Sequence, residues 1–143
     1  MTNNPLFDTV SLPYGGLTMT DALLLIDHGS KRQEANNQLF DMVSLLEKFI
    51  PNTIVVGAHM ELCDPSIKHG VQTCIDRGAT HIIACPYMLA PGRHSTSDIP
   101  RLVEDAVSKH TDISHTMTPC LGVDDTIAQL ILKRARLDHL VTQ

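Results

Sequence analysis

Two patterns of apolar residues alternate along the chain. Short, continuous apolar runs are typical of strands that are buried on both faces of a sheet. Between them, apolar residues recur every three or four positions, which predicts amphipathic helices. The predicted strands cover residues 22–27, 53–58, 80–85 and 113–117, and the predicted helices cover residues 31–49, 64–77, 98–110 and 123–140. Asp64 is expected to cap the second of these helices, with Pro65 in its first turn.

This regular alternation of strand and helix predicts the fold class. Right-handed crossovers place such strands in one parallel sheet with helices on both faces. We therefore expect an α/β fold, a small doubly wound four-stranded sheet in a three-layer α/β/α arrangement, with strand order 2-1-3-4. Residues 21–143 form a single domain in this interpretation, preceded by a turn-rich extension over residues 1–20. Ligands of such sheets bind beyond the carboxyl ends of the strands, where the winding reverses.

Composition excludes several classes of function. A formal net charge of −5, with no basic run, argues against nucleic-acid binding, and 3% aromatic residues without tryptophan argue against base stacking. No apolar run approaches the length of a membrane-spanning helix, and the first 30 residues contain no Lys or Arg, so we expect no targeting segment. The four cysteines form no C-x-x-C pair. Scattered thiols suggest a reducing compartment, and we expect the cytoplasm.

Three residues that bind metals or protons follow three successive strands. His28 follows the first predicted strand, Glu61 the second and His94 the third. The carboxyl ends of parallel strands share one edge, so these side chains are expected on one rim. Two imidazoles and a carboxylate suit a divalent first-row metal ion, and they also accept protons near neutral pH. The alternative is that each residue is an ordinary loop or capping residue.

Basic residues are expected near the same rim. Lys31 and Arg32 follow His28, and Arg93 precedes His94; Lys68 and Arg101 are expected in first helical turns. In an acidic protein this grouping suggests an anionic ligand, to which helix N-termini add a favourable field. Taken singly, each residue is equally consistent with a solvated surface charge.

Ser95 stands directly after His94 in the sequence and has two plausible roles. Its hydroxyl suits a hydrogen bond to a ligand carboxylate. It equally suits a cap before the third helix.

Three separated segments resemble the motifs of one enzyme family. Residues 23–36 (LLLIDHGSKRQEAN), residues 60–67 (MELCDPSI) and residues 86–94 (PYMLAPGRH), the last followed by Asp98-Ile99-Pro100, resemble in order the motifs of the class II tetrapyrrole chelatases. The likeness covers residues 21–140 and is to the short CbiX/SirB-type sirohydrochlorin cobaltochelatases and ferrochelatases. It implies insertion of Fe²⁺ or Co²⁺ into sirohydrochlorin, in siroheme or cobalamin biosynthesis.

The resemblance also implies residue roles. It marks His28 and His94 as the pair that holds the metal and accepts protons, and Glu61 as their acidic partner. Sirohydrochlorin carries many carboxylates, so Lys31, Arg32 and Arg93, with Ser95, become candidate substrate-binding residues. Short members of the family act as homodimers, so a homodimer is expected here.

Some features separate this chain from its relatives. Plant-type members carry a cysteine-rich carboxyl tail for an iron–sulfur cluster, whereas no cysteine follows Cys120 here, so we expect no such cluster. No cofactor is expected beyond the substrate metal, and Fe²⁺, Co²⁺ and Ni²⁺ all suit the ligands. The sequence leaves the metal and the pathway open.

Two other functions fit parts of the pattern. A metal-delivery protein would use His28 and His94 without catalysis, and tetrapyrrole binding would distinguish it from a chelatase. A flavodoxin-like or receiver-like module has similar winding. However, Asp27 stands alone as a phosphorylation candidate, and the chain has only two Tyr and three Phe to cover a flavin.

Overall fold

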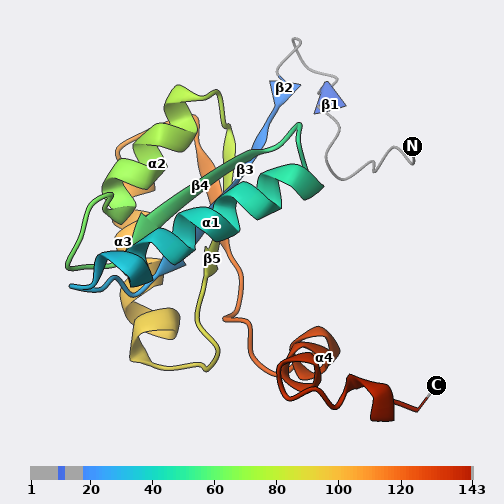
Figure 1. Cartoon of the computed structure of the whole chain (residues 1–143). Helices are drawn as coiled ribbons and strands as arrows, with labels where there is room; N and C mark the ends of the chain where they lie inside the picture. The colour runs from blue at the N-terminus through green and yellow to red at the C-terminus, as the bar shows by residue number, and fades with distance from the viewer. Residues whose placement is uncertain (1–9, 12–17, 143) are drawn as a thin grey trace.

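The structure, a computed structural model, describes residues 10–11 and 18–142 of the chain (Figure 1). The elements follow one another in the order β1 (Val10–Ser11), β2 (Thr18–Met19), β3 (Asp21–Asp27), α1 (Gln33–Phe49), β4 (Ile54–His59), α2 (Ile67–Asp76), β5 (His81–Pro86), η1 (His94–Asp98), α3 (Ile99–Val107), β6 (Ser114–Met117), α4 (Asp125–Arg134) and η2 (Asp138–Leu140).

The main sheet has four parallel strands in the order β4-β3-β5-β6. In chain order these are the second, first, third and fourth of the strands predicted from the sequence, so the expected order is confirmed. Leu24 on β3 lies opposite Val56 of β4 on one side and Ala84 of β5 on the other. Strand β3 is central and its two faces lie in the two buried clusters, which explains its continuous apolar sequence.

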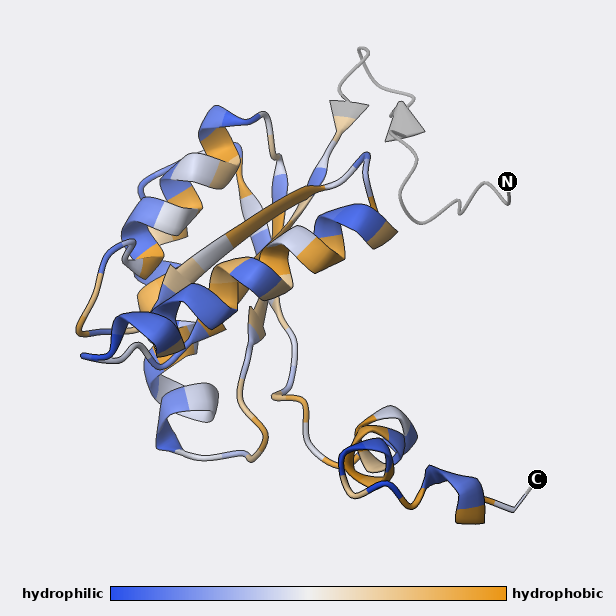
Figure 2. Cartoon of the chain, in the orientation of Figure 1, coloured by the Kyte–Doolittle hydropathy of each residue, from blue (hydrophilic) through white to orange (hydrophobic). Residues whose placement is uncertain are grey.

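The two faces of the sheet are packed differently (Figures 1 and 2). Helices α2 and α3 cover one face, where Leu24, Ile26 and Ile82 are fully buried against side chains such as Val71 and Val103. On the other face α1 packs over β4 and β3, and the buried cluster there is smaller: Leu25, Leu39, Val43 and Val55. Most of the core therefore lies between the sheet and α2 and α3.

The second helix begins later than expected. Helix α2 starts at Ile67, and the hydroxyl of Ser66, not the carboxylate of Asp64, caps it by accepting from His69 N–H at 3.1 Å. The reason is that Pro65 is held elsewhere: its carbonyl accepts a hydrogen bond from His59 N–H at 2.8 Å. Residues 64–66 therefore run along the end of β4 and cannot belong to the helix. The prediction that Asp64 caps this helix was wrong.

The third helix begins earlier than expected. A π-helical turn, η1, starts at His94 and continues directly into α3, so the expected loop over residues 86–97 ends before His94. The Gly92 carbonyl nucleates this turn by accepting both the N–H and the hydroxyl of Thr96, at 2.9 and 2.6 Å. His94 consequently lies on a helical turn and not on an irregular loop.

The last helix leaves the body of the domain, as Figures 1 and 2 show. Helix α4 ends at Arg134 instead of near residue 140, because Arg136 takes a left-handed conformation (φ 59°). None of its residues is buried. We call residues 123–142 the C-terminal arm. The apolar side of α4 therefore does not belong to the core.

The predicted N-terminal extension falls largely outside the described residues. Within the described part, β1 and β2 pair antiparallel, with Val10 opposite Met19. The Thr20 carbonyl accepts from Thr80 N–H at 2.8 Å, which ties the start of β3 to β5. A search of the described helices finds none that is long and apolar enough to cross a membrane.

Candidate active site

The carboxyl ends of β3, β4 and β5 bring His28, Glu61 and His94 to one rim of the sheet. The Nε2 atom of His28 lies 3.3 Å from Oε1 of Glu61. The imidazole rings of His28 and His94 stand edge to face, with centroids 4.7 Å apart and planes at 77°. Residues separated by 33 and 66 positions therefore meet, as the rim hypothesis requires. All three side chains are about half exposed, at 45%, 50% and 48%, so a ligand reaches them from solvent.

The hydrogen bonds of His28 specify which nitrogen faces Glu61. Its Nδ1 lies 3.2 Å from the Gly29 carbonyl, which accepts only. With the proton on Nδ1, Nε2 presents a lone pair toward a carboxylate oxygen that also carries lone pairs. Two such acceptors at 3.3 Å repel each other unless a proton or a metal cation lies between them. The pair is therefore complementary to either species.

His94 is oriented by a carboxylate on its own helical turn. Its Nδ1 lies 3.0 Å from Oδ2 of Asp98, four residues further on. A carboxylate at Nδ1 fixes the tautomer and the ring and leaves Nε2 free to bind a cation, the arrangement common around metal-binding histidines. Arg93, whose side chain is 87% exposed, approaches the same Asp98 carboxylate at 3.9 Å.

Backbone contacts hold the loop that carries His28 against the loop that carries Glu61. The Glu61 N–H donates to the His28 carbonyl at 3.2 Å, and the Met60 N–H donates to the Asp27 carbonyl at 2.9 Å. Gly29 has φ +90°, and a Cβ atom there would lie 1.9 Å from the Glu61 carbonyl oxygen. Only glycine permits both this conformation and this approach.

A buried asparagine fixes the next part of the first loop. Asn36 on α1 is 3% exposed; its Oδ1 accepts from Ser30 N–H at 2.9 Å and its Nδ2 donates to the Ser30 carbonyl at 2.8 Å. One side chain thus satisfies both backbone groups of Ser30. This contact determines where the chain leaves the rim to enter α1.

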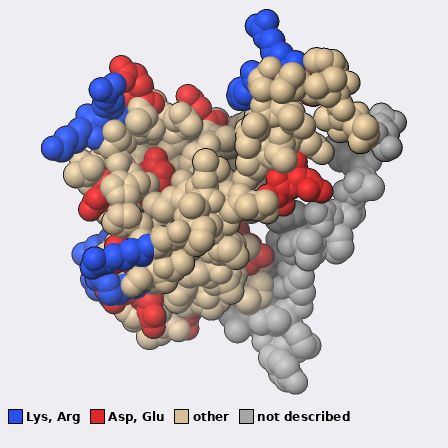
Figure 3. Space-filling model, turned by 90° about the horizontal axis from the view of Figure 1, so that it is seen from below, with Lys and Arg blue, Asp and Glu red and all other residues tan. Residues whose placement is uncertain are grey.

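The expected basic residues are exposed, and they share the rim with acidic ones. Lys31, Arg32, Arg93, Lys68 and Arg101 are all exposed to solvent. Figure 3 shows basic and acidic side chains together at its left margin, the side on which the loops after β3 and β4 lie in Figure 1, and a broad uncharged area across the middle. The surface beside the site is therefore mixed in charge and not a continuous basic patch.

Ser95 lies beside the histidines but faces inward. It is 7% exposed, and its hydroxyl accepts from Gly92 N–H at 3.1 Å and donates to the Gly92 carbonyl at 3.3 Å. These hydrogen bonds to the backbone agree with the second role expected for Ser95, that of a cap before the third helix. Contact with a ligand stays a prediction for this residue.

A cavity of about 290 Å³ opens beside His28, lined by Asp27, Gly29, Gln38, Tyr87 and Met88 among others. It is too small to enclose a macrocycle, so a large ligand would lie across the rim with only part of it in the cavity. Among residues 10–11 and 18–142, no three or more His, Cys, Asp and Glu side chains are arranged to ligate one metal ion. The candidate metal-binding side chains approach one another in two pairs, His28 with Glu61 and His28 with His94.

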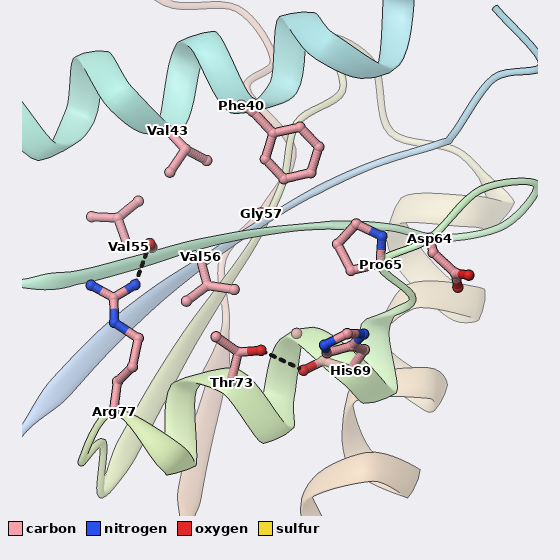
Figure 4. Close-up of a pocket in the computed structure, with 11 residues that line it drawn as sticks. Phe40, Val43, Val55, Val56, Gly57, Asp64, Pro65, His69, Thr73 and Arg77 are labelled. Carbon is pink, nitrogen blue, oxygen red and sulfur yellow. Dashed lines mark hydrogen bonds between the residues drawn. The ribbon is translucent and has the colours of Figure 1, made fainter. Parts of the chain in front are cut away.

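A larger concavity, of about 440 Å³, lies at the outer edge of β4 between α1 and α2 (Figure 4). Its walls are mainly apolar and include Phe40, Val43 and Val56. Arg77 crosses it and donates to the Val55 carbonyl at 3.2 Å, so an edge carbonyl of the sheet is already satisfied. The groove thus runs along an edge strand whose backbone Arg77 partly covers. The candidate catalytic side chains lie elsewhere, at the rim.

Two carboxylates beside the site were not singled out from the sequence. Asp98 supports His94, and its signal is the His94–Asp98 spacing of four residues on a helix. Asp27, considered only for phosphorylation, accepts from the ring of His59. His59 is a buried histidine packed behind the rim. Its partner on the neighbouring strand carries no signal in the sequence, because the pairing depends on strand register.

Comparison with known proteins identifies the family. The CbiX family model matches residues 22–137. The chain is 36% identical to the sirohydrochlorin cobaltochelatase of Methanocaldococcus jannaschii, over 80% of this chain and 97% of that protein. It is 35% identical to the chloroplastic sirohydrochlorin ferrochelatase of Arabidopsis thaliana, over 94% of this chain and 59% of that protein. The chain belongs to the CbiX family, and the resemblance to this family of chelatases is confirmed.

Solved structures show the same fold. The sirohydrochlorin chelatase SirB from Bacillus subtilis subspecies spizizenii, crystallised with cobalt, superposes with a TM-score of 0.77 at 25% identity, over 82% of this chain and 50% of that one. The expected α/β fold is thus confirmed. The chain spans about half the length of several relatives that it matches, 59% of the plant ferrochelatase and 43% of the ferrochelatase of Priestia megaterium.

Proposed function

We propose that this protein inserts a divalent metal ion, Fe²⁺ or Co²⁺, into sirohydrochlorin, as a step of siroheme or cobalamin biosynthesis. The observation that carries the proposal is the meeting of His28 Nε2, Glu61 Oε1 and the His94 ring at one open rim. Relatives named sirohydrochlorin ferrochelatase and sirohydrochlorin cobaltochelatase, in plants, bacteria and archaea, support it.

The reaction replaces two pyrrole protons by one metal ion, so the site must release a cation and accept two protons. His28 and His94 each direct Nδ1 to an oxygen acceptor and keep Nε2 available. Neutral nitrogen ligands with one carboxylate bind Fe²⁺ or Co²⁺ and still allow its release. Once the metal has left, the same nitrogens and Glu61 are free to take up the pyrrole protons.

The substrate is recognised by its carboxylates. Lys31, Arg32 and Arg93 are exposed around the rim and have side chains long enough to follow a flexible carboxylate. The uncharged area in the middle of Figure 3 suits the flat face of the macrocycle, while charged groups at the margin suit its periphery. Ser95 would contribute only if its turn opened.

The test is anaerobic metal insertion followed by the absorbance of sirohydrochlorin, with Fe²⁺, Co²⁺ and Ni²⁺ in parallel. The wild-type protein is expected to accelerate insertion of at least one metal, and His28→Ala and His94→Ala to abolish the acceleration. His110→Ala, at the opposite edge of the sheet, is the matched control. Uncatalysed rates in the wild type would contradict the proposal.

The second candidate is a metal-delivery protein that uses His28 and His94 without catalysis. The half-exposed side chains of the rim would let a carrier take up and release a metal ion as readily as a chelatase would. Sirohydrochlorin binding separates the two functions, because a carrier has no use for the macrocycle. Metal binding without sirohydrochlorin binding would establish the carrier.

We propose no resident cofactor beyond the substrate metal, and a reducing, cytoplasmic location. All four cysteines are unpaired in the structure, and Cys74 is fully buried. An iron–sulfur absorption band in freshly purified protein would contradict the first part of this proposal. Secretion of the native protein would contradict the second.

We further propose that two copies of the chain assemble through the C-terminal arm. Leu130 and Ile131 on α4 are exposed, at 45% and 62%, and no residue of this helix is buried against the described part of the chain. On the α1 face of the sheet, Ile83 and Cys85 of β5 remain partly exposed, and Phe49 of α1 is 76% exposed. A helix from a second copy fits this incompletely covered face.

Sedimentation analysis tests the assembly. The wild-type protein is expected to be a dimer and Ile131→Glu a folded monomer, because Ile131 is 62% exposed in the single chain. Gln129→Glu, an exposed polar position on the same helix, should remain dimeric. A monomeric wild type would reject the dimer, and a dimeric Ile131→Glu would reject the arm as its contact.

A further inference from the structure

A polar pair of side chains lies directly behind the site, the His59 imidazole fully buried and the Asp27 carboxylate 18% exposed. His59, the last residue of β4, is 1% exposed, and its Nδ1 lies 2.5 Å from Oδ1 of Asp27, the last residue of β3. The two residues are opposite each other in the parallel register of these strands. The ring of Phe40 stands edge to face against His59, with centroids 5.6 Å apart and planes at 84°. The imidazole is thus held by one hydrogen bond and by packing.

A polar pair at this position lowers the stability of the fold relative to apolar side chains. Burial of polar groups costs free energy that one hydrogen bond only partly returns. The Nε2 atom of His59 is buried without a hydrogen-bond partner among the described residues, which adds to that cost. Apolar side chains of similar volume would generally be no less stable there. A polar pair is therefore explained better by geometry than by stability.

The geometry that it controls is the last rung of the β3–β4 ladder. Immediately beyond the pair, Met60 N–H donates to the Asp27 carbonyl, and Glu61 N–H donates to the His28 carbonyl. The Cβ of His59 also lies 3.3 Å from the position that a Cβ on Gly29 would occupy. A shift of one strand end against the other would therefore move His28 relative to Glu61.

We infer that Asp27 and His59 are positioning residues that set the distance between His28 Nε2 and Glu61 Oε1. The effect of this distance on catalysis rests on the proposed function. The role of the pair in setting the distance does not. A side-chain hydrogen bond between strand ends is directional, whereas apolar contacts tolerate sliding. The pair therefore holds two metal-binding atoms at a separation suited to one cation.

The test compares three substitutions at His59 and Asp27. His59→Leu removes the donor, His59→Asn keeps a donor near the position of Nδ1, and Asp27→Ala removes the acceptor. His59→Leu and Asp27→Ala are expected to lower kcat about 10- to 100-fold, with an unchanged KM for sirohydrochlorin, because neither residue grips the carboxylates. His59→Asn should recover most of kcat. His110→Leu, at the other edge of the sheet, is the control.

Co²⁺ titration, followed by its visible absorption, provides a readout that does not need catalysis. Loss of donor or acceptor should weaken Co²⁺ binding about 10-fold or more, and His59→Asn should restore it. If the wild type binds Co²⁺ but inserts none, the proposed function fails while this comparison still decides the inference. Unchanged Co²⁺ binding and kcat in folded His59→Leu would overturn it. If that variant does not fold, the same result in Asp27→Ala would overturn it.

Discussion

The two halves of the candidate site are supported in different ways. On the β3–β4 side, His28 and Glu61 depend on contacts between segments more than 30 residues apart, including two backbone hydrogen bonds and the close approach at Gly29. On the β5 side, His94 depends on its own turn, through Asp98 four residues away and the Gly92 carbonyl. One half is therefore fixed by tertiary structure and the other by local structure.

This difference predicts different tolerance to substitution. A tertiary support fails when either of two distant segments moves, so small changes there have large effects. A local support moves as one unit, so its histidine keeps its orientation if the turn shifts. This combination would suit the proposed metal insertion, because a fixed pair can bind the ion while the other histidine adjusts to the substrate.

The largest expected effect comes from Gly29→Ala, with Gly92→Ala as its matched control. A Cβ at Gly29 would overlap the Glu61 carbonyl at 1.9 Å in a left-handed conformation, whereas nothing lies within 4 Å of a Cβ at Gly92. Gly29→Ala should cost about 2 kcal/mol or more of unfolding free energy and about 100-fold in insertion rate. Urea unfolding and the insertion assay measure both. Equal effects of the two substitutions would contradict the difference between the halves.

A smaller effect is expected at Asp98, the local support of His94. Asp98→Ala frees the imidazole and should lower the insertion rate about 10-fold, with little loss of stability because His94 is half exposed. Asp98→Asn, which retains an oxygen acceptor, should lose less. Asp105→Ala, at an exposed acidic position on α3, is the control. A loss at Asp98 as large as that at Gly29 would show that both halves are equally rigid.

Reversal of the rim charges should act on substrate binding alone. Lys31→Glu, Arg32→Glu and Arg93→Glu are each expected to raise the KM for sirohydrochlorin a few-fold, since exposed ion pairs contribute about 0.2–1 kcal/mol. The effect should shrink at high salt. Lys109→Glu, which follows α3 at the far edge of the sheet, should change nothing. An unchanged KM in all three rim variants would remove these residues from the binding surface.

The last effect appears only at alkaline pH and concerns the core that supports β4. Burial raises the pKa of the Cys74 thiol from its ordinary value of 9.0 to about 12. Above pH 9 the unfolded chain releases this proton while the folded chain retains it, so stability falls between pH 9 and 12, by at most about 1.4 kcal/mol per pH unit. Chemical denaturation across this range should show a steeper decline for wild type than for Cys74→Ala. The same decline of unfolding free energy with pH in both proteins would contradict the raised pKa of Cys74.

Much of the fold followed from local patterns. The apolar runs predicted the β3, β4 and β5 strands to within one residue or so at most ends, and the alternation with helices predicted their order. Errors arose where a hydrogen bond that the apolar pattern does not encode redirected the backbone. Pro65 was expected in α2, but its carbonyl accepts from His59 N–H. His94 was expected in a loop, but it lies on a turn nucleated by the Gly92 carbonyl.

The sequence by itself determined the rim, because parallel strands of predictable order must end at one edge, and His28, Glu61 and His94 each follow such an end. Only the tertiary structure decided the separations, 3.3 Å for His28 to Glu61 and 4.7 Å for the two rings, because these depend on strand register and loop approach. It also decided that Asp27 faces His59 and that α4 leaves the domain. Spacing in the chain limits which residues meet, whereas packing sets their distance.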